Sequence, residues 1–219
     1  MIQTRNLAFA HPGAAPLVFA DLDVAQGGTL LLRGASGAGK STWLSLAAGL
    51  RSPSTGQITV AGQALGQMGN AARDLWRAKV IGFLPQKLHL SDALTVHGNL
   101  ALVYFAAGLP QDDAAIRHAL DVLGVAGRAG RKPQQVSGGP AQRVALARAV
   151  LLAPAVILAD EPTASLDDEA ARAALDLLQA SAQRCTATLV IATHDRRVEQ
   201  ALPHAQVHFL GIKSASSAQ

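Results

Sequence analysis

The sequence has a single cysteine, few aromatic residues and no long apolar run. Cys185 is the only cysteine among 219 residues, so no disulfide can form within the chain, which fits a reducing compartment. Aromatic residues make up 4% and charged residues 16%, which is still a globular composition. The most apolar stretch, residues 144–159, is interrupted by Arg148 and Pro154 and falls short of the roughly 20 apolar residues of a membrane span. We therefore expect a globular protein without a span of its own.

The N-terminus argues against secretion, and the scattered positions of the basic residues argue against nucleic-acid binding. Residues 1–6 are not followed by the apolar core of a signal peptide. The formal net charge of +4 is mildly basic and by itself only weak evidence for nucleic acid or an anionic membrane surface, and the basic residues do not cluster as a nucleic-acid footprint would. A chain of this length buries about 70% of the surface it would expose unfolded, so it needs no structural metal. We expect one cytoplasmic protein that a partner must hold at any membrane where it works.

A glycine-rich loop between an apolar run and a helix-compatible run carries the strongest chemical signal. Residues 34–41 match G-x-x-x-x-G-K-[ST], the pattern of a phosphate-binding loop. Its glycines let successive backbone N–H groups face an anion, and the positive end of the following helix faces the same point. Lys40 adds a cation for the β- and γ-phosphates, and the Ser41 hydroxyl is a ligand for Mg²⁺. The nucleotide-binding residues expected here are Gly34, Ala35, Ser36, Gly37, Ala38, Gly39, Lys40, Ser41 and Thr42.

Two acidic residues directly after another apolar run are candidates for holding a metal ion beside this loop. Residues 156–159 predict a strand buried on both faces, and Asp160 and Glu161 follow it. Ligands of parallel sheets gather beyond the carboxyl ends of the strands, so Asp160 is expected beside Ser41, where it would hold Mg²⁺ through its water shell. Glu161 could then reach an attacking water.

The periodicity divides the chain into an α/β core and a helical insertion. We expect a core of residues 1–86 and 153–213, a helical subdomain of residues 87–152 and a disordered tail of residues 214–219. Strands are expected at 3–9, 17–24, 29–33, 57–61, 80–84, 156–159, 188–192 and 207–210, and helices after Lys40 and at 94–107, 112–123, 141–152 and 168–183.

A third motif resembles the signature of the ATP-binding cassette (ABC) ATPases, the engines of ABC transporters. Residues 136–143 read V-S-G-G-P-A-Q-R, where the family has L-S-G-G-Q followed by Q-R and a helix. Residues 83–86 (F-L-P-Q) resemble its Q-loop, residues 164–167 (A-S-L-D) its D-loop and residues 193–195 (T-H-D) its switch region. The resemblance runs from about residue 3 to residue 210. It implies a P-loop NTPase core with a mainly parallel sheet, an N-terminal antiparallel β region and an inserted helical subdomain.

The resemblance also implies that two copies of the chain pair head to tail, with ATP and Mg²⁺ at their seam. Each ATP would lie between the phosphate loop of one chain and Ser137, Gly138 and Gly139 of the other. A second chain would thereby complete a cage around the γ-phosphate that a single helix N-terminus leaves open. Its hydroxyl and N–H donors would be placed to stabilise the negative charge that moves during phosphoryl transfer.

Three catalytic residues follow from the same resemblance. Glu161 would be the general base or water orienter. His194 would donate to the γ-phosphate or hold the water against Glu161. Gln86 would sense Mg²⁺ and the water, and its loop would move the helical insertion with the nucleotide state. The expected metal ligands are Ser41, Gln86 and Asp160.

Two positions depart from the family pattern. The family has an aromatic residue, typically Tyr, near the end of the first strand, where this chain has Phe9 and His11. His11 either stacks on adenine in place of that residue or is simply an exposed loop residue, with Phe9 in the core. Pro140 replaces the signature glutamine and removes a backbone N–H, which costs little at the first position of a helix. We expect a retuned site that still turns over, with a poor ATPase as the alternative.

The function favoured by these motifs is the ATP-binding subunit of a transporter, working with a separate transmembrane permease. The subunit would sit peripherally on the cytoplasmic face of the inner or plasma membrane. Residues 81–100 resemble the lipoprotein-release and macrolide-export branch. The alternatives are a soluble non-transport ABC ATPase and a nucleotide-binding regulatory module with low turnover. The coiled-coil insertion, zinc cysteines or second cassette of the non-transport members are not visible in the sequence.

Overall fold

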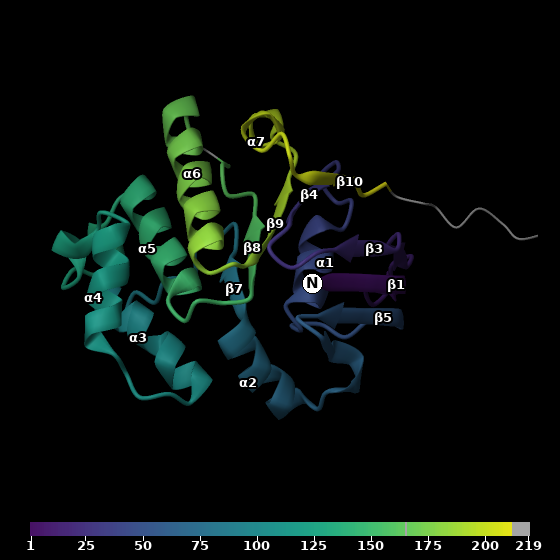
Figure 1. Cartoon of the computed structure of the whole chain (residues 1–219), viewed down its shortest axis with the longest axis horizontal. Helices are drawn as coiled ribbons and strands as arrows, with labels where there is room; N and C mark the ends of the chain where they lie inside the picture. Colours follow the sequence, from purple (N-terminus) through teal and green to yellow (C-terminus); the bar gives the residue numbers. More distant parts are fainter. Residues whose placement is uncertain (165, 212–219) are drawn as a thin grey trace, which may run out of the picture.

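A parallel sheet of five strands forms the centre of the molecule (Figure 1). The computed structural model describes residues 1–164 and 166–211, so the predicted tail at 214–219 lies outside the described residues. The sheet has the order β10–β4–β9–β8–β7, and all its neighbouring strands run parallel. Its strands are β10 (Gln206–Phe209), β4 (Thr29–Arg33), β9 (Thr188–Thr193), β8 (Val156–Asp160) and β7 (Ile81–Leu84).

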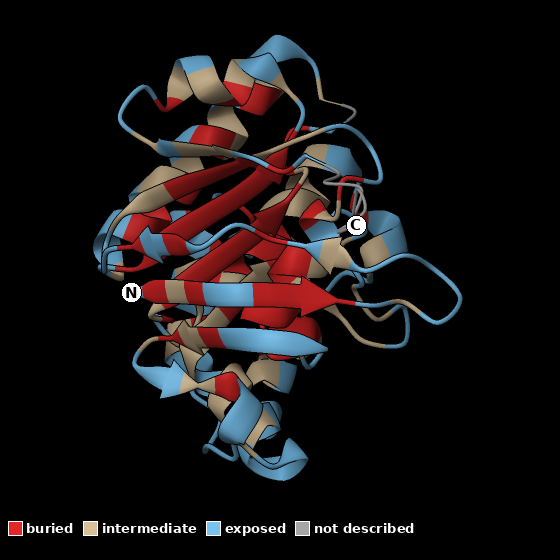
Figure 2. Cartoon of the chain, turned by 90° about the vertical axis from the view of Figure 1, so that its right-hand side faces the viewer, coloured by how far each residue is buried: buried red, intermediate tan, exposed pale blue. Residues whose placement is uncertain are grey.

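The inner strands are buried along their length, because helices or a second sheet cover both faces (Figure 2). In β9, Leu189 and Ile191 belong to an apolar cluster shared with the helical insertion. Val190 and Ala192 belong to a second cluster, shared with the N-terminal strands and α1. This alternation follows from the period of two in a strand.

The register of the sheet sets where the functional loops emerge. Arg33 of β4 pairs with Thr193 of β9, Asp160 of β8 pairs with Ala192, and Leu84 of β7 pairs with Ala159. The loops that follow all four strands therefore leave from the same edge of the sheet. This edge is where ligands gather in open α/β sheets.

A second, antiparallel sheet is built on β1 (Ile2–Phe9), which pairs with three other strands. The expected strand at 17–24 is wrong as one element, since it forms two strands with a gap. The two strands pair with β1 in one continuous register, Ala8 with Val18 and Thr4 with Leu22, and the ladder is interrupted beside Asn6, whose φ is 49° and whose N–H donates to the Asp21 carboxylate. The remaining strands of this sheet are β2 (Leu17–Val18), β3 (Leu22–Val24), β5 (Thr55–Val60) and β6 (Gln63–Ala64).

Three successive helices make up the insertion and lie together on one side of the molecule (Figure 1). They are α3 (Val96–Ala107), α4 (Asp113–Val122) and α5 (Gly138–Val150), with short 3₁₀ turns at Ala126–Arg128 and Pro133–Gln135. The core carries α1 (Lys40–Ala47), α2 (Asn70–Val80), α6 (Asp168–Arg184) and α7 (Arg196–Ala201), with a third turn at Leu65–Gln67. The α/β fold predicted from the sequence is confirmed.

The helix expected at 141–152 begins three residues earlier than predicted, at Gly138. Its opening Gly-Gly-Pro reads as a loop because these are poor helix formers. The first turn of a helix uses no intrahelical N–H donors, so proline is tolerated there. Pro140 is therefore the third residue of α5, and the next N–H, that of Ala141, donates to Ser137 O at 3.3 Å.

Two helices, α2 and α7, were not predicted. The helix α7 has only six residues, too few to show a helical period in the sequence. The helix α2 is amphipathic, and its Trp76 packs against the core, so its periodicity was overlooked rather than absent. The helix α2 links the second sheet to β7.

Candidate functional site

The phosphate-binding loop joins β4 to α1 through glycines in conformations that other residues rarely adopt. Gly37 has φ of 81° and Gly39 has φ of 93°. A Cβ on Gly34 would lie 2.7 Å from the carbonyl oxygen of Leu210, so a side chain cannot fit there. The loop therefore passes close to the sheet and delivers Lys40 at the first turn of α1.

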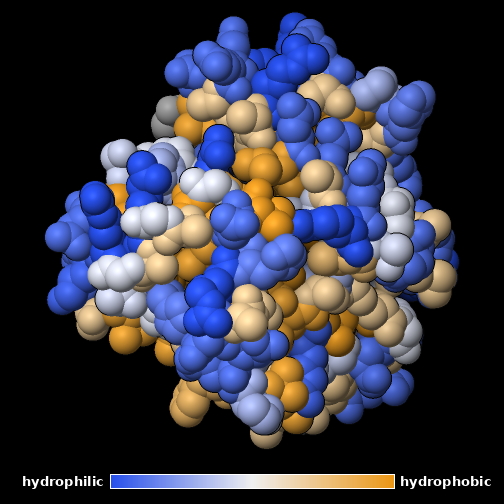
Figure 3. Space-filling view, turned by 60° about the vertical axis from the view of Figure 1, so that its left-hand side comes forward, coloured by the Kyte–Doolittle hydropathy of each residue, from blue (hydrophilic) through white to orange (hydrophobic). Residues whose placement is uncertain are grey.

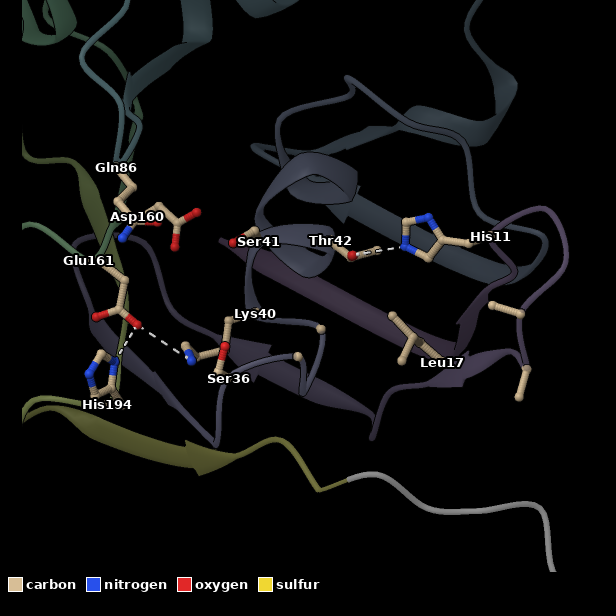
Figure 4. A pocket seen from close by; sticks show the side chains of 14 residues that line it. His11, Leu17, Ser36, Lys40, Ser41, Thr42, Gln86, Asp160, Glu161 and His194 are labelled. Carbon is tan, nitrogen blue, oxygen red and sulfur yellow. Dashed lines mark hydrogen bonds and ion pairs between the residues drawn. The ribbon is translucent and has the colours of Figure 1, made fainter.

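A cleft of about 500 Å³ opens beside this loop (Figure 4). Ser36, Lys40, Ser41 and Thr42 lie in its middle. Gln86, Asp160, Glu161 and His194 form one end, and His11 and Leu17 lie at the other. Strands β7, β8, β9 and β4 thus bring together residues that are up to 158 positions apart in the sequence, from Ser36 to His194.

Of the other predicted loop residues, Gly37 and Gly39 also line the cleft. The remaining three, Gly34, Ala35 and Ala38, do not line it. Lys40 Nζ donates to the carbonyl oxygens of Gly34 at 2.9 Å and Ala35 at 3.3 Å, and Ala38 is buried in the core.

The acidic end of the cleft centres on the carboxylate of Glu161. Its Oε1 lies 2.8 Å from His194 Nδ1 and 3.4 Å from Lys40 Nζ. The side chains of Glu161 and Lys40 are 9% and 8% exposed, whereas that of His194 is 70% exposed. A buried carboxylate thus meets one fixed cation and one imidazole that reaches the surface.

The sequence motifs assign no role to Thr193, although it is the first residue of the T-H-D segment. Thr193 Oγ1 donates to Glu161 Oε2 at 3.0 Å. The signal available in the sequence was its place at the end of a buried strand, immediately before His194.

Asp160 is buried and lies across from Ser41 (Figure 4). Burial raises the pKa of this carboxyl, against the lowering effect of the Ser41 hydroxyl. Within the described part of the chain, its Oδ1 has no hydrogen-bond partner. An isolated buried carboxylate oxygen of this kind fits a metal ligand.

The other end of the cleft has an imidazole and small apolar side chains. His11 Nε2 lies 3.3 Å from Thr42 Oγ1, and the His11 ring meets the Phe9 ring edge-on with centroids 4.8 Å apart. Phe9 is 9% exposed and belongs to the core, so only His11 of the two reaches the cleft. Ala14, Ala15 and Leu17 complete this end.

The structure does not bring Ser137, Gly138 and Gly139 into this cleft. They begin α5, where Ser137 and Gly138 are exposed and the Ser137 side chain does not cap the helix. Gly138 lines a smaller hollow of about 220 Å³, together with Gln86, Asp160 and Glu161.

A polar network lies beside the acidic end and joins the segment after Glu161 to the start of α7. Asp195 accepts from the Thr163 hydroxyl at 2.7 Å and from Arg197 Nε at 2.9 Å. Arg197 Nη1 donates in turn to Leu166 O at 3.2 Å and to Asp168 Oδ1 at 2.7 Å. Hydrogen bonds from Arg197 and Thr163 lower the pKa of Asp195 to about 2.

Comparison with known proteins agrees with this geometry. A family model described as "ABC transporter" matches residues 19–164. The lipoprotein-releasing system ATP-binding protein LolD of Bacteroides fragilis is 41% identical over 197 residues, which cover 89% of this chain and 91% of the relative. LolD of Oleidesulfovibrio alaskensis is 38% identical, covering 85% of this chain and 83% of the relative.

Two further matches extend this picture. The macrolide export ATP-binding/permease protein MacB 1/2 of Paracoccus denitrificans is 39% identical over 90% of this chain, which spans 30% of that longer protein. Among solved structures, the dimeric structure of MJ0796, a bacterial ABC transporter cassette, has a TM-score of 0.86 at 27% identity and covers 96% of this chain and 94% of that chain. The expected similarity to the lipoprotein-release and macrolide-export branch is confirmed.

Proposed function

The chain belongs to the ABC transporter family of ATP-binding ATPases, and from this membership we propose how its cleft holds ATP, hydrolyses it and drives a separate permease. The observation that carries the proposal is the convergence of Lys40, Glu161 and His194 in one cleft. It puts a phosphate-binding cation within reach of a carboxylate and an imidazole that can handle a water and its proton.

The order of residues along the cleft gives ATP a direction. The triphosphate would lie over residues 36–42, with its γ-phosphate towards Glu161 and His194 and its base towards His11 (Figure 4). The apolar side chain of Leu17 and the imidazole of His11, whose ring packs edge-on against Phe9, suit contact with a flat base.

Mg²⁺ would be held by Asp160, Ser41 and Gln86. Asp160 offers a buried oxygen free of hydrogen bonds in the described chain, Gln86 adds an uncharged oxygen at the same end of the cleft, and Ser41 adds another from its middle, across from Asp160. Among the described residues, no group of three or more His, Cys, Asp or Glu side chains is arranged to hold a metal ion by itself, so phosphate oxygens and water would complete the shell. When bound, Mg²⁺ neutralises charge on the transferred phosphoryl group.

Glu161 is the proposed general base or water orienter, and His194 its partner at the γ-phosphate. Glu161 accepts from two neighbouring side chains of the β9 end, Thr193 and His194, which would keep its carboxylate aimed into the cleft. His194 can serve two partners because most of its ring is exposed.

A second copy of the chain would complete each site. Ser137 and Gly138 are exposed at a helix N-terminus, outside the chain's own cleft, so their donors are available to the nucleotide of another chain. The similarity to a dimeric ABC transporter cassette supports this arrangement.

The permease would hold the subunit at the cytoplasmic face of the membrane. No helix in the described ranges, 1–164 and 166–211, is long and apolar enough to cross a bilayer. The helical side exposes hydrophobic groups between polar ones (Figure 3), and α3 and its following turn leave Leu102, Phe105 and Leu109 exposed. Relatives named for lipoprotein release, macrolide export and methionine import have 38–41% identity, so we assign cargo recognition to the permease.

Steady-state ATP hydrolysis by the purified chain, with and without its permease, tests this function. We expect the chain to hydrolyse ATP in a Mg²⁺-dependent reaction, at a rate that differs between the free chain and its complex with the permease. Nucleotide binding with no turnover in either state would instead identify the low-turnover regulatory module that Pro140 suggested.

A further inference from the structure

The carboxylate of Glu161 is held through both of its oxygens by successive residues of one strand end. Thr193 Oγ1 contacts Oε2 at 3.0 Å, and His194 Nδ1 contacts Oε1 at 2.8 Å. Thr193 is fully buried, whereas His194 is largely exposed. The hydroxyl contact is therefore enclosed in the core, whereas the imidazole contact is open to solvent.

The direction of the Thr193 hydrogen bond follows from its two partners. The backbone N–H of Asp195 donates to Thr193 Oγ1 at 3.0 Å, so that oxygen is already an acceptor. An ionised carboxylate can only accept, so the Thr193 hydroxyl must donate to Glu161. This leaves the hydroxyl one orientation, because β-branched side chains are also restricted at χ1.

The backbone around Glu161 is held from the same strand. Its N–H donates to Ala192 O at 2.8 Å, and its φ of 47° lies in the left-handed region that few non-glycine residues adopt. Thr193 in turn pairs with Arg33, the last residue of the strand before the phosphate-binding loop. The end of β9 thus fixes both the main chain and the carboxylate of Glu161 relative to that loop.

We propose that Thr193 is a positioning residue for ATP hydrolysis, which acts by holding Oε2 of Glu161. The terminal torsion of a glutamate is broad, so one contact leaves the carboxylate plane free to turn. The Thr193 hydroxyl removes this freedom and keeps Oε1 directed to His194 and the cleft. The inference rests on the proposed role of Glu161 as base or water orienter.

Thr193→Val tests it, because valine keeps the shape of threonine and removes the hydroxyl. We expect kcat of the full chain with Mg·ATP to fall about 10-fold, as positioning losses do, while KM changes less than about 2-fold. Thr193→Ser restores the hydroxyl and should return kcat to within about 3-fold of the original. An unchanged kcat in Thr193→Val would overturn the inference.

Thr188 provides a matched control at the opposite end of the same strand. It is also fully buried, and its hydroxyl also makes two hydrogen bonds, donating to Ala25 O and accepting from Gly27 N at 3.2 Å each. Thr188→Val therefore removes the same kind of group far from the cleft. It should lower thermal stability about as much as Thr193→Val and leave kcat unchanged. A similar fall of kcat in both variants would reduce the role of Thr193 to general stability and overturn the inference.

A double variant separates this inference from the proposed function. If Thr193 acts through Glu161, Thr193→Val should have little effect on the residual rate of Glu161→Gln. A full further loss in that background would overturn the inference. Should Glu161→Gln itself hydrolyse ATP at the original rate, the role of Glu161 is wrong and the inference goes with it. If Glu161→Gln hydrolyses ATP slowly while Thr193→Val keeps the original rate, the role of Glu161 stands and only the proposed role of Thr193 is overturned.

Discussion

The ammonium of Lys40 lies 3.4 Å from the carboxylate of Glu161, with both side chains more than nine-tenths buried. The cation proposed to hold phosphate and the carboxylate proposed to act on water therefore face each other across one cleft. Removing either should affect a different step.

Replacement of Lys40 by alanine should weaken ATP binding. A charge-assisted contact to phosphate stabilises a complex by about 1.5–3 kcal/mol, so we expect roughly 10- to 100-fold weaker binding in titration calorimetry. Lys79→Ala, which removes an exposed lysine of α2, is the control and should bind normally. Unchanged affinity in Lys40→Ala would count against the phosphate-binding loop.

The variant Glu161→Gln should keep ATP binding and lose hydrolysis. The amide can still occupy the same space, but it cannot take a proton, so we expect a rate at least about 10²-fold lower. Bound ATP would then persist and stabilise a dimer, visible by size-exclusion chromatography coupled to light scattering. Hydrolysis at the original rate would show that Glu161 has another role.

Pro140→Gln should raise the rate of hydrolysis in the complex with the permease. Pro140 is the third residue of α5, where its missing N–H breaks no intrahelical bond, so the substitution should not disturb the helix. It would restore the side chain that the family signature carries. A lower rate would show that the proline is an adaptation of this chain.

Asp195 should contribute to stability at neutral pH and lose that contribution in acid. Its pKa is lowered to about 2 by Arg197 and Thr163, from an ordinary value of 3.8. A lowered pKa stabilises the folded chain above about pH 4, and the contribution declines as the pH falls from about 4 to about 2. Arg197→Gln should therefore lower the free energy of unfolding at pH 7 and differ less from the original chain at pH 3.

The exposed neighbour Arg196 gives the control for this comparison. Arg196→Gln should leave urea denaturation nearly unchanged at both pH values. An equal deficit of Arg197→Gln at pH 7 and pH 3 would mean that the ion pair with Asp195 is not its source.

Local patterns in the sequence predicted the parts of the site that local geometry determines. The phosphate-binding loop needs glycines at fixed positions, and Asp160 and Glu161 follow a strand whose burial is visible as a continuous apolar run. The fold class followed from the same periodicity and is confirmed.

The misses depend on tertiary contacts that no short pattern contains. The strand at 17–24 divides beside Asn6 of another strand, whose positive φ and whose N–H bond to Asp21 interrupt the ladder, and α5 starts at Gly138 although its first turn has poor helix formers. The roles of Thr193 and Arg197 rest on side-chain directions across segments about 30 residues apart. The donors of Ser137 and Gly138 concern another chain, so their role stays a prediction.

Mixing two inactive variants tests the central claim, that two copies of the chain share each ATP. Lys40→Ala damages the phosphate-binding loop. Gly138→Asp places a negative charge at the exposed start of α5, where an added Cβ meets no atom within 4 Å, so the fold should tolerate it. A mixed dimer would hold one intact site, made from the loop of one variant and the signature residues of the other.

The measurement is ATP hydrolysis by each variant alone and by their equimolar mixture. We predict that each alone is inactive and that the mixture recovers up to about a quarter of the original activity, since half of the dimers carry one intact site of two. A mixture as inactive as its components, or a fully active Gly138→Asp chain, would contradict the account.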